Sequence, residues 1–156
     1  MLIMGTDFIN TNASFDISMK RNGPSVFLRA WAESGADEND PVMIQWGGSG
    51  YNATAFAASN FCYVGVPEGT QSVGAGSWGW FQIMGPVDDV QAGSVTSFTG
   101  SIGHAVNFAA GTGLNASGSA YIGASPSMGR VGVLRSYVNE SSTADIYLTG
   151  VWATGI

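Results

Sequence analysis

Between Ser77 and Met84 the side chains alternate with a period of two residues, which is the period of a β-strand. One face of the extended chain would carry Trp78, Trp80, Gln82 and Met84. The other face would carry Gly79, Phe81 and Ile83. Because both faces hold large apolar side chains, the pattern predicts a strand in a sheet that is buried on both sides. The residues Pro86-Val87-Asp88-Asp89 that follow predict a turn.

Similar alternation, or a short apolar run between turn residues, predicts further strands along the chain. Their expected bounds are Ser14–Lys20, Ser25–Trp31, Val42–Trp46, Phe61–Val66, Ser94–Phe98, His104–Phe108, Ala120–Ile122, Gly129–Tyr137 and Asp145–Trp152. The turn residues Asn22-Gly23-Pro24 predict a hairpin. Asn52–Asn60 is rich in alanine and fits either a short helix or a strand. Many short strands with Gly-rich turns predict an all-β fold, either an antiparallel β-sandwich or a jelly-roll-like barrel.

The chain of 156 residues has the length of one domain. We expect a single β-sandwich domain over residues 14–156, preceded by a polar and irregular N-terminal arm over residues 1–13. The first residues hold no basic segment and too short an apolar run for a signal peptide or a membrane span. Cys62 is the single cysteine, so we expect no intramolecular disulfide and infer synthesis in a reducing cytosol.

Charged residues make up only 10% of the chain, against about a quarter in typical soluble proteins. Glycine and other small residues take their place, which predicts a smooth and nearly neutral surface. Such a surface suits a protein that packs against copies of itself or a partner, and it equally suits a plain extracellular β-domain. The net charge is −6 and the five Lys and Arg residues form no basic run, so we expect no direct binding to nucleic acid or to a membrane.

Few residues are of types that carry chemistry. His104 is the only histidine and no serine lies in a nucleophile elbow, which disfavours a hydrolase. Gly74–Gly79 matches G-x-G-x-x-G, but a strand is expected after it where a dinucleotide site needs a helix. The acidic loop Glu33–Asp40 offers oxygen ligands for calcium without the spacing of a defined calcium loop, and Asp88 and Asp89 are expected to point apart into solvent. We therefore predict no enzyme activity, no cofactor and no metal site.

Five tryptophans raise the question of a sugar-binding platform. They are Trp31, Trp46, Trp78, Trp80 and Trp152. Exposed, coplanar indole rings would make a lectin or a carbohydrate-binding module, whereas the alternative places most of the rings in the core or in subunit interfaces. Oligomeric state separates the two readings. Apolar surface that is covered by symmetry indicates assembly, and exposed aromatic rings on a monomer indicate ligand binding.

A set of short motifs follows one another from about Val64 to Val133. They are Val64-Gly65-Val66, Gly74-Ala75-Gly76, Trp78-Gly79-Trp80-Phe81-Gln82 with Gly85, Gln91-Ala92-Gly93, Ile122-Gly123-Ala124 and Val131-Gly132-Val133-Leu134. Their order resembles small structural proteins of tailed bacteriophages, particularly head decoration (capsid cement) proteins. The resemblance covers less than half of the chain. Its motifs are structural and bring no catalytic residues with them.

The function that this resemblance implies is mechanical. A protein of this kind would form a homotrimer on the outer surface of a virion capsid and bridge neighbouring subunits of the major capsid protein, so that many modest contacts together stabilise the shell. It would be made in the host cytoplasm. The expected interface residues are Phe8 and Ile9 in the arm, together with Trp46, Trp78 and Trp80. The acidic loop would face solvent or a basic patch of the shell. The alternatives are a carbohydrate-binding or lectin-like β-sandwich module and a structural protein of the phage tail or baseplate.

Overall fold

The computed structural model describes residues 19–47, 50–54, 63–69, 71–91, 99–109, 121–123, 130–139 and 143–150. Every regular element in these ranges is a β-strand, so the all-β fold class is confirmed. In the same part of the chain, no helix has the length and apolar character needed to cross a membrane. The arm expected over residues 1–13, with Phe8 and Ile9, and the strand expected at Ser94–Phe98 lie outside the described residues.

The strands are short, with one exception. Their bounds are β1 Met19–Asn22, β2 Ser25–Ala32, β3 Val42–Trp46, β4 Tyr51–Thr54, β5 Tyr63–Pro67, β6 Ser77–Gln91, β7 Thr99–Gly100, β8 Ala105–Ala109, β9 Tyr121–Gly123, β10 Arg130–Leu134, β11 Val138–Asn139 and β12 Thr143–Thr149. Within the described ranges, ten of them form one sheet, and β7 and β11 pair with each other.

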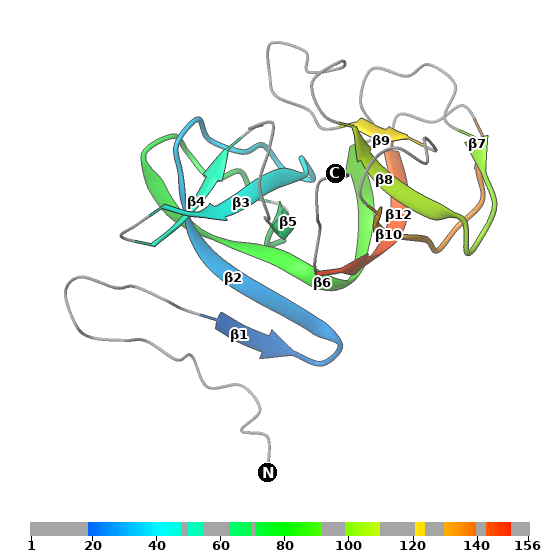
Figure 1. The fold of residues 1–156 in the computed structure, drawn as a ribbon, viewed down its shortest axis with the longest axis horizontal. Helices are drawn as coiled ribbons and strands as arrows, with labels where there is room; N and C mark the ends of the chain where they lie inside the picture. The colour runs from blue at the N-terminus through cyan, green and yellow to red at the C-terminus, as the bar shows by residue number, and fades with distance from the viewer. Residues whose placement is uncertain are drawn as a thin grey trace.

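Part of this sheet closes into a barrel. The strands follow one another in the order β2, β4, β3, β5 and β6, and β6 pairs back onto β2 (Figure 1). β2 and β4 run parallel, with Trp31 opposite Asn52, while the other neighbouring pairs of the barrel are antiparallel. A parallel pair needs a crossover connection, and β3 lies within it, because the chain passes through β3 before it returns as β4. The barrel is therefore mixed rather than wholly antiparallel.

Small and branched side chains fill the interior of the barrel. This buried cluster consists of Leu28, Ala30, Ala32, Ala36, Val42, Ile44, Ala53, Phe81 and Ile83. Leu28 and Phe81 lie opposite each other on β2 and β6. Gly65 on β5 makes room for the large side chains, because a Cβ atom there would lie 2.7 Å from Ile44 Cδ1 and 3.0 Å from Phe81 Cβ. Burial of each large apolar side chain contributes roughly 1.5–3 kcal/mol to folding.

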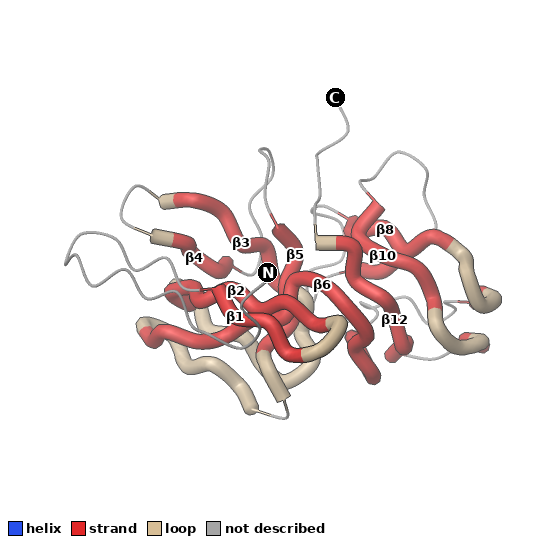
Figure 2. The backbone as a smooth tube through the Cα atoms, turned by 90° about the horizontal axis from the view of Figure 1, so that it is seen from below, coloured by secondary structure: helices blue, strands red, loops and turns tan. Residues whose placement is uncertain are grey.

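β6 is the longest strand, with 15 residues, and belongs to two parts of the molecule. Its first half pairs with β2, and its second half pairs with β12, where Gly85 lies opposite Leu148 and Gln91 opposite Thr143. β10, β8 and β9 continue outward from β12, each antiparallel to its neighbour. Figures 1 and 2 show the barrel and this outer sheet side by side, joined by β6.

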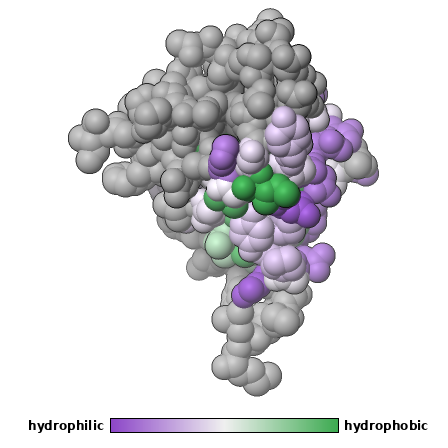
Figure 3. All heavy atoms as spheres, turned by 90° about the vertical axis from the view of Figure 1, so that its right-hand side faces the viewer, coloured by the Kyte–Doolittle hydropathy of each residue, from purple (hydrophilic) through white to green (hydrophobic). Residues whose placement is uncertain are grey.

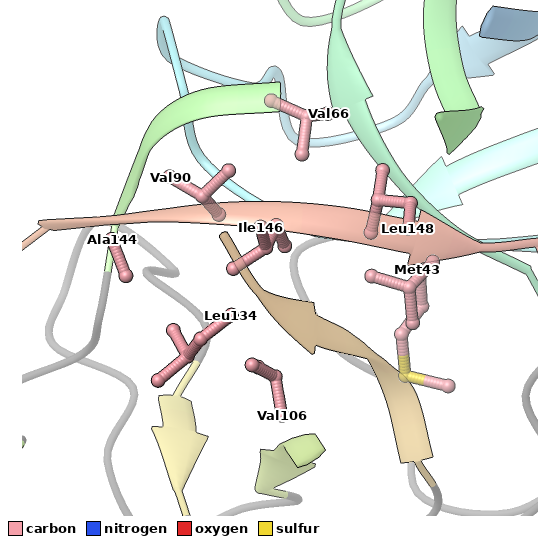
Figure 4. Close-up of a cluster of buried hydrophobic side chains, with 9 residues drawn as sticks. Met43, Val66, Val90, Val106, Leu134, Ala144, Ile146 and Leu148 are labelled. Atoms are coloured by element: carbon pink, nitrogen blue, oxygen red, sulfur yellow. The ribbon is translucent and has the colours of Figure 1, made fainter. Parts of the chain in front are cut away.

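A second hydrophobic cluster fills the space between the barrel wall and the outer sheet. Met43 on β3 lies opposite Val64 on β5, and the two alternate with Ile44 and Gly65, which face the barrel interior. Met43, Val64 and Val66 therefore face outward. They join side chains of β6, β8, β10 and β12, namely Val90, Val106, Leu134, Ala144, Ile146 and Leu148. Figure 4 shows the cluster gathered around β12. The outer sheet thus covers one wall of the barrel.

The expected strand bounds agree with the structure best where clear turn residues flank them. β3 has the expected bounds Val42–Trp46, and β2 extends one residue beyond Ser25–Trp31. The predicted hairpin is confirmed, since Asn22 lies opposite Ser25 and Gly23 has a φ of 56°. In the segment Asn52–Asn60, the described residues up to Thr54 belong to β4, and the rest lie outside the described part.

The turn predicted at Pro86–Asp89 is wrong, because β6 continues through it to Gln91. A bulge absorbs the turn-forming residues. The register between β6 and β12 shifts between Ala144 and Ile146, and Asp89 takes a φ of 53°. The expectation that β6 is buried on both sides is also wrong, since Trp78 on its outer face is exposed.

Candidate functional site

Three tryptophans lie on the outer face that β2 and β6 share. Trp31 is opposite Trp78, and Arg29 is opposite Trp80. Residues opposite each other on neighbouring antiparallel strands project to the same side of the sheet, so these four side chains share a face. The rings of Trp31 and Trp78 meet edge to face, with centroids 5.7 Å apart and planes 69° apart. Trp78 is 38% exposed, so part of its ring is open to solvent.

Two cations cover parts of this aromatic face. Lys20 Nζ, on β1, lies 4.6 Å from the centre of the Trp80 ring, and the Arg29 guanidinium lies 5.4 Å from the centre of the Trp78 ring. Lys20 Nζ also lies 2.6 Å from Glu68 Oε2 at the end of β5. Each cation–π contact at such a partly exposed site contributes about 0.5–1 kcal/mol. These contacts fix the ring positions more than they stabilise the fold.

A pocket lies beside this face, between the β5–β6 connection and the first residues of β6. Its volume is about 310 Å³. We call it the Trp78 pocket, and its lining residues are Glu68, Gln71, Ser72, Val73, Gly74, Ser77, Trp78, Gly79 and Trp80. The connection is held in place by hydrogen bonds from the Val73 N–H to the Ala36 carbonyl and from the Glu38 N–H to Ser72 Oγ, 2.8 and 3.2 Å long. The pocket wall is therefore tied to the acidic loop.

A second aromatic group lies where β3, β4 and β5 meet. Trp46 and Tyr51 are opposite each other, with ring centroids 5.1 Å apart, and Tyr51 and Tyr63 follow at 6.1 Å. Burial, followed by the neighbouring Tyr63, raises the pKa of Tyr51 above its usual value. Tyr51 and Tyr63 pack against the barrel interior, whereas Trp46 is 45% exposed. The group presents one open indole ring.

The five residues expected at an interface have different environments. Phe8 and Ile9 lie outside the described residues. Trp46 belongs to the second aromatic group, and Trp78 and Trp80 line the Trp78 pocket. The structure therefore brings Trp78 and Trp80 together, whereas Trp46 meets Tyr51 edge to face in a separate aromatic group.

The acidic loop does not face solvent throughout, and that expectation is wrong for Asp40. This residue is only 6% exposed, and its N–H donates to the Asp37 carbonyl at 3.1 Å. Burial, and then the nearby charge of Asp37, raises the pKa of the Asp40 carboxyl from 3.8 to about 6. The Asn39 carbonyl accepts a hydrogen bond from the Gln91 N–H, which fastens the loop to the end of β6.

Other residues considered for chemistry are held in structural contacts. His104 is exposed and directly precedes β8, where its Nδ1 accepts a hydrogen bond of 3.2 Å from the Ser101 N–H. Asp88 pairs with Arg135 at 2.6 Å. In the described part of the chain, no three His, Cys, Asp or Glu side chains gather as a metal site would require. Gly74–Gly79 leads into strand β6, which is not the structure of a dinucleotide site.

The side of the molecule formed by the outer sheet carries its own exposed apolar residues. Figure 3 looks onto this side and shows hydrophobic surface in one small patch among paler and hydrophilic side chains. Ile102, in the turn before β8, is 70% exposed, and Tyr137, before β11, is 64% exposed. Exposed apolar groups of this size are common on protein surfaces and do not by themselves define a site.

Sequence reasoning singled out Trp78 and Trp80 but missed the polar residues around them. Lys20 and Glu68 are 48 positions apart, and Ser72 meets Glu38 across 34 positions. No local pattern links such residues, because the closure of the barrel brings them together. The one available signal was the short polar run Glu68–Ser72 directly before a tryptophan-rich strand.

No protein-family model matches the chain, and no curated protein matches it. Among solved structures, the chain is similar to the N base of head fiber gp8.5 in bacteriophage phi29. The match covers 82% of this chain and 97% of the other, with 18% sequence identity and a TM-score of 0.48. A likeness of this degree carries no inference about function.

Proposed function

We propose that the chain is a non-enzymatic structural protein of a tailed-phage virion, where it decorates the outer surface of the capsid. In this role it bridges subunits of the major capsid protein, and its own subunits associate as a homotrimer. The proposal rests on the residue motifs and their positions in the fold, and is independent of the likeness to the head fiber.

The observation that carries the proposal is the position of the phage-like motifs. Val64-Gly65-Val66 forms most of β5, Trp78–Gln82 follows the first residue of β6, and Val131–Leu134 forms most of β10. These strands are scaffold, and Gly65 makes room for the barrel core while Val64 and Val66 join the second cluster. A resemblance carried mostly by strand positions fits a protein whose task is to hold a shape.

The surface supplies a second argument. A chain with 10% charged residues offers few long side chains that would lose rotamer freedom or need ion partners when subunits pack together. Trp46 is an open indole ring on this surface, and tryptophan is among the residues that dominate binding at interfaces. We assign Trp46 to contacts with the shell or with a second subunit.

The direct test is co-sedimentation of the purified chain with capsid shells built from the major capsid protein of the same phage. We expect saturable binding, and Trp46→Ala should weaken it. Ile102→Ala serves as a matched control, because it also removes an exposed apolar side chain, on the side of the outer sheet. Failure to bind shells would contradict the decoration role and leave the tail or baseplate alternative in its place.

Two further measurements address the finer claims. Light scattering should give the mass of a trimer, and a monomer at the concentrations used for shell binding would contradict the homotrimer. Deletion of residues 1–13 should weaken attachment without lowering the thermal midpoint, as expected for an arm with Phe8 and Ile9 at the contact. Unchanged attachment would contradict the arm.

A further inference from the structure

The Trp78 pocket has a composition that the capsid role does not use. Two indole rings form part of its lining, and polar side chains of Glu68, Gln71, Ser72 and Ser77 form much of the rest. Its volume of about 310 Å³ is at the small end of the usual range for ligand sites, which is about 300–1,000 Å³. Aromatic walls with a few convergent polar groups are the general pattern of a small-molecule site.

The charges around the pocket disfavour anionic ligands. Glu68 is the only charged residue among the described lining residues, and its Oε2 is paired with Lys20 Nζ at 2.6 Å. The pair contributes no net charge. An anionic ligand would meet the Glu68 carboxylate, and the two cations nearby are already engaged, Lys20 with Glu68 and the Trp80 ring and Arg29 with the Trp78 ring. The pocket therefore favours an uncharged ligand.

The polar groups favour a ligand that both donates and accepts hydrogen bonds. The Gln71 amide has both functions, the Ser72 and Ser77 hydroxyls can donate as well as accept, and the Glu68 carboxylate accepts. Ser72 Oγ already accepts from the Glu38 N–H, which leaves its proton for a ligand. A purely apolar ligand would remove these groups from solvent without giving them a hydrogen-bond partner, at a cost for each.

The aromatic groups favour a ligand with an apolar ring face. Arg29 on β2 and Lys20 on β1 contact the Trp78 and Trp80 rings, so both rings are positioned before any ligand arrives. Rigid, amphipathic rings of this kind give contact area at little entropic cost. A sugar ring has an apolar face of C–H groups and a rim of hydroxyls, and it matches both parts of the lining.

We propose that the Trp78 pocket binds a neutral saccharide, with C–H groups packed on Trp78 and hydroxyls bonded to the side chains of Glu68, Gln71 and Ser72. This inference goes beyond the capsid role and does not depend on it. It assigns Trp78 and Trp80, which were expected at an assembly interface, to ligand binding, and it leaves Trp46 to assembly. A virion protein with such a site would contact glycans on the surface of a cell.

The experiment uses the full chain on an array of neutral and acidic glycans, followed by titration of a neutral glycan that binds, monitored by tryptophan fluorescence. We expect binding to one or more neutral glycans. Trp78→Ala should weaken it about tenfold or more, because loss of one stacked aromatic contact and its buried area exceeds about 1.4 kcal/mol. Gln71→Ala should weaken binding as well, while Trp78→Phe should restore part of it.

Trp46→Ala is the matched control, because it removes an exposed indole ring outside the pocket. It should leave glycan binding unchanged and lower only the attachment to shells, so the two proposals fail separately. The near-ultraviolet circular dichroism of each variant checks that the barrel is intact. The assignment would be overturned if the chain bound no neutral glycan or bound acidic glycans alone. It would also be overturned if neither Trp78→Ala nor Gln71→Ala weakened the binding.

Discussion

Replacement of Asp40 by asparagine should stabilise the protein at neutral pH and have little effect in acid. Asp40 is buried in the acidic loop, and burial, followed by the charge of Asp37, raises its pKa from 3.8 to about 6. At neutral pH the carboxylate is therefore ionised in a site that favours its protonated form. Asparagine has nearly the same shape and carries no charge, so the cost of ionisation disappears.

The sign and the size follow from linkage between protonation and folding. The folded state keeps its proton to a higher pH than the unfolded state, whose pKa is near the ordinary value of 3.8. The stabilisation that the protonated Asp40 carboxyl gives to the folded state is therefore fully present below about pH 3.8. It is lost as the pH rises through about 6. A shift of about two pKa units, at about 1.4 kcal/mol per unit, corresponds to roughly 3 kcal/mol at most.

The assay is urea unfolding of the wild type and Asp40→Asn at a series of pH values from about 4 to about 8. The gap between their unfolding free energies should move in favour of the variant by up to about 3 kcal/mol across this series. Asp37→Asn should make the unfolding free energy depend less strongly on pH than in the wild type, because it removes the charge that helps to raise the Asp40 pKa. Glu38 is an exposed acid in the same loop, so the unfolding free energy of Glu38→Gln should change with pH as that of the wild type does. A constant gap between wild type and Asp40→Asn would refute the reasoning.

Three other substitutions test the packing. Phe81→Ala should lower the unfolding free energy by about 3–5 kcal/mol in urea titrations, because it leaves a cavity at the centre of the barrel; a loss below about 1 kcal/mol would contradict the barrel core. Gly132→Ala should prevent or greatly weaken folding, seen as a lowered thermal midpoint, because its Cβ would overlap the Tyr147 carbonyl oxygen on β12; a midpoint equal to wild type would show that the two strands are not this close. Arg135→Gln should change stability by less than about 1 kcal/mol at any salt concentration, because its ion pair with Asp88 is exposed.

Sequence patterns predicted the strands well where alternation and turn residues agreed. The segments expected as strands at Ser25–Trp31 and Val42–Trp46 alternate or run apolar between clear turns, and both formed, the first with one added residue. The alternation in Trp78–Met84 also placed Phe81 and Ile83 on one face of the strand, which the structure buries in the barrel, although the pattern predicted burial of both faces. Such local signals hold because side-chain direction follows strand geometry whatever the partner strand is.

The features that escaped prediction depend on contacts between distant residues. Pro86 and Asp88-Asp89 are turn residues in isolation, yet pairing with β12 and a bulge keep them in a strand. The parallel pairing of β2 with β4 follows from barrel closure, which no local pattern encodes. Asp40 looked like a solvent-exposed acid, and its burial arises because the loop is fastened to β6 by the bond between Asn39 and Gln91. The Trp78 pocket was missed for the same reason, since Lys20 and Glu68 meet only in the folded chain.

The position of β6 in two sheets has a consequence during synthesis. By the time the ribosome has released Gln91, all strands of the barrel have emerged, and this part can begin to close. Met43, Val64 and Val66 then remain uncovered until β12, the last of the described strands, pairs with the second half of β6. The nascent chain therefore carries an apolar wall for the time needed to translate more than 50 residues, about 3–10 s at typical rates. A chain truncated after β6 should consequently be captured by chaperones or aggregate, whereas the chain that includes β8, β10 and β12 covers this wall with its own strands.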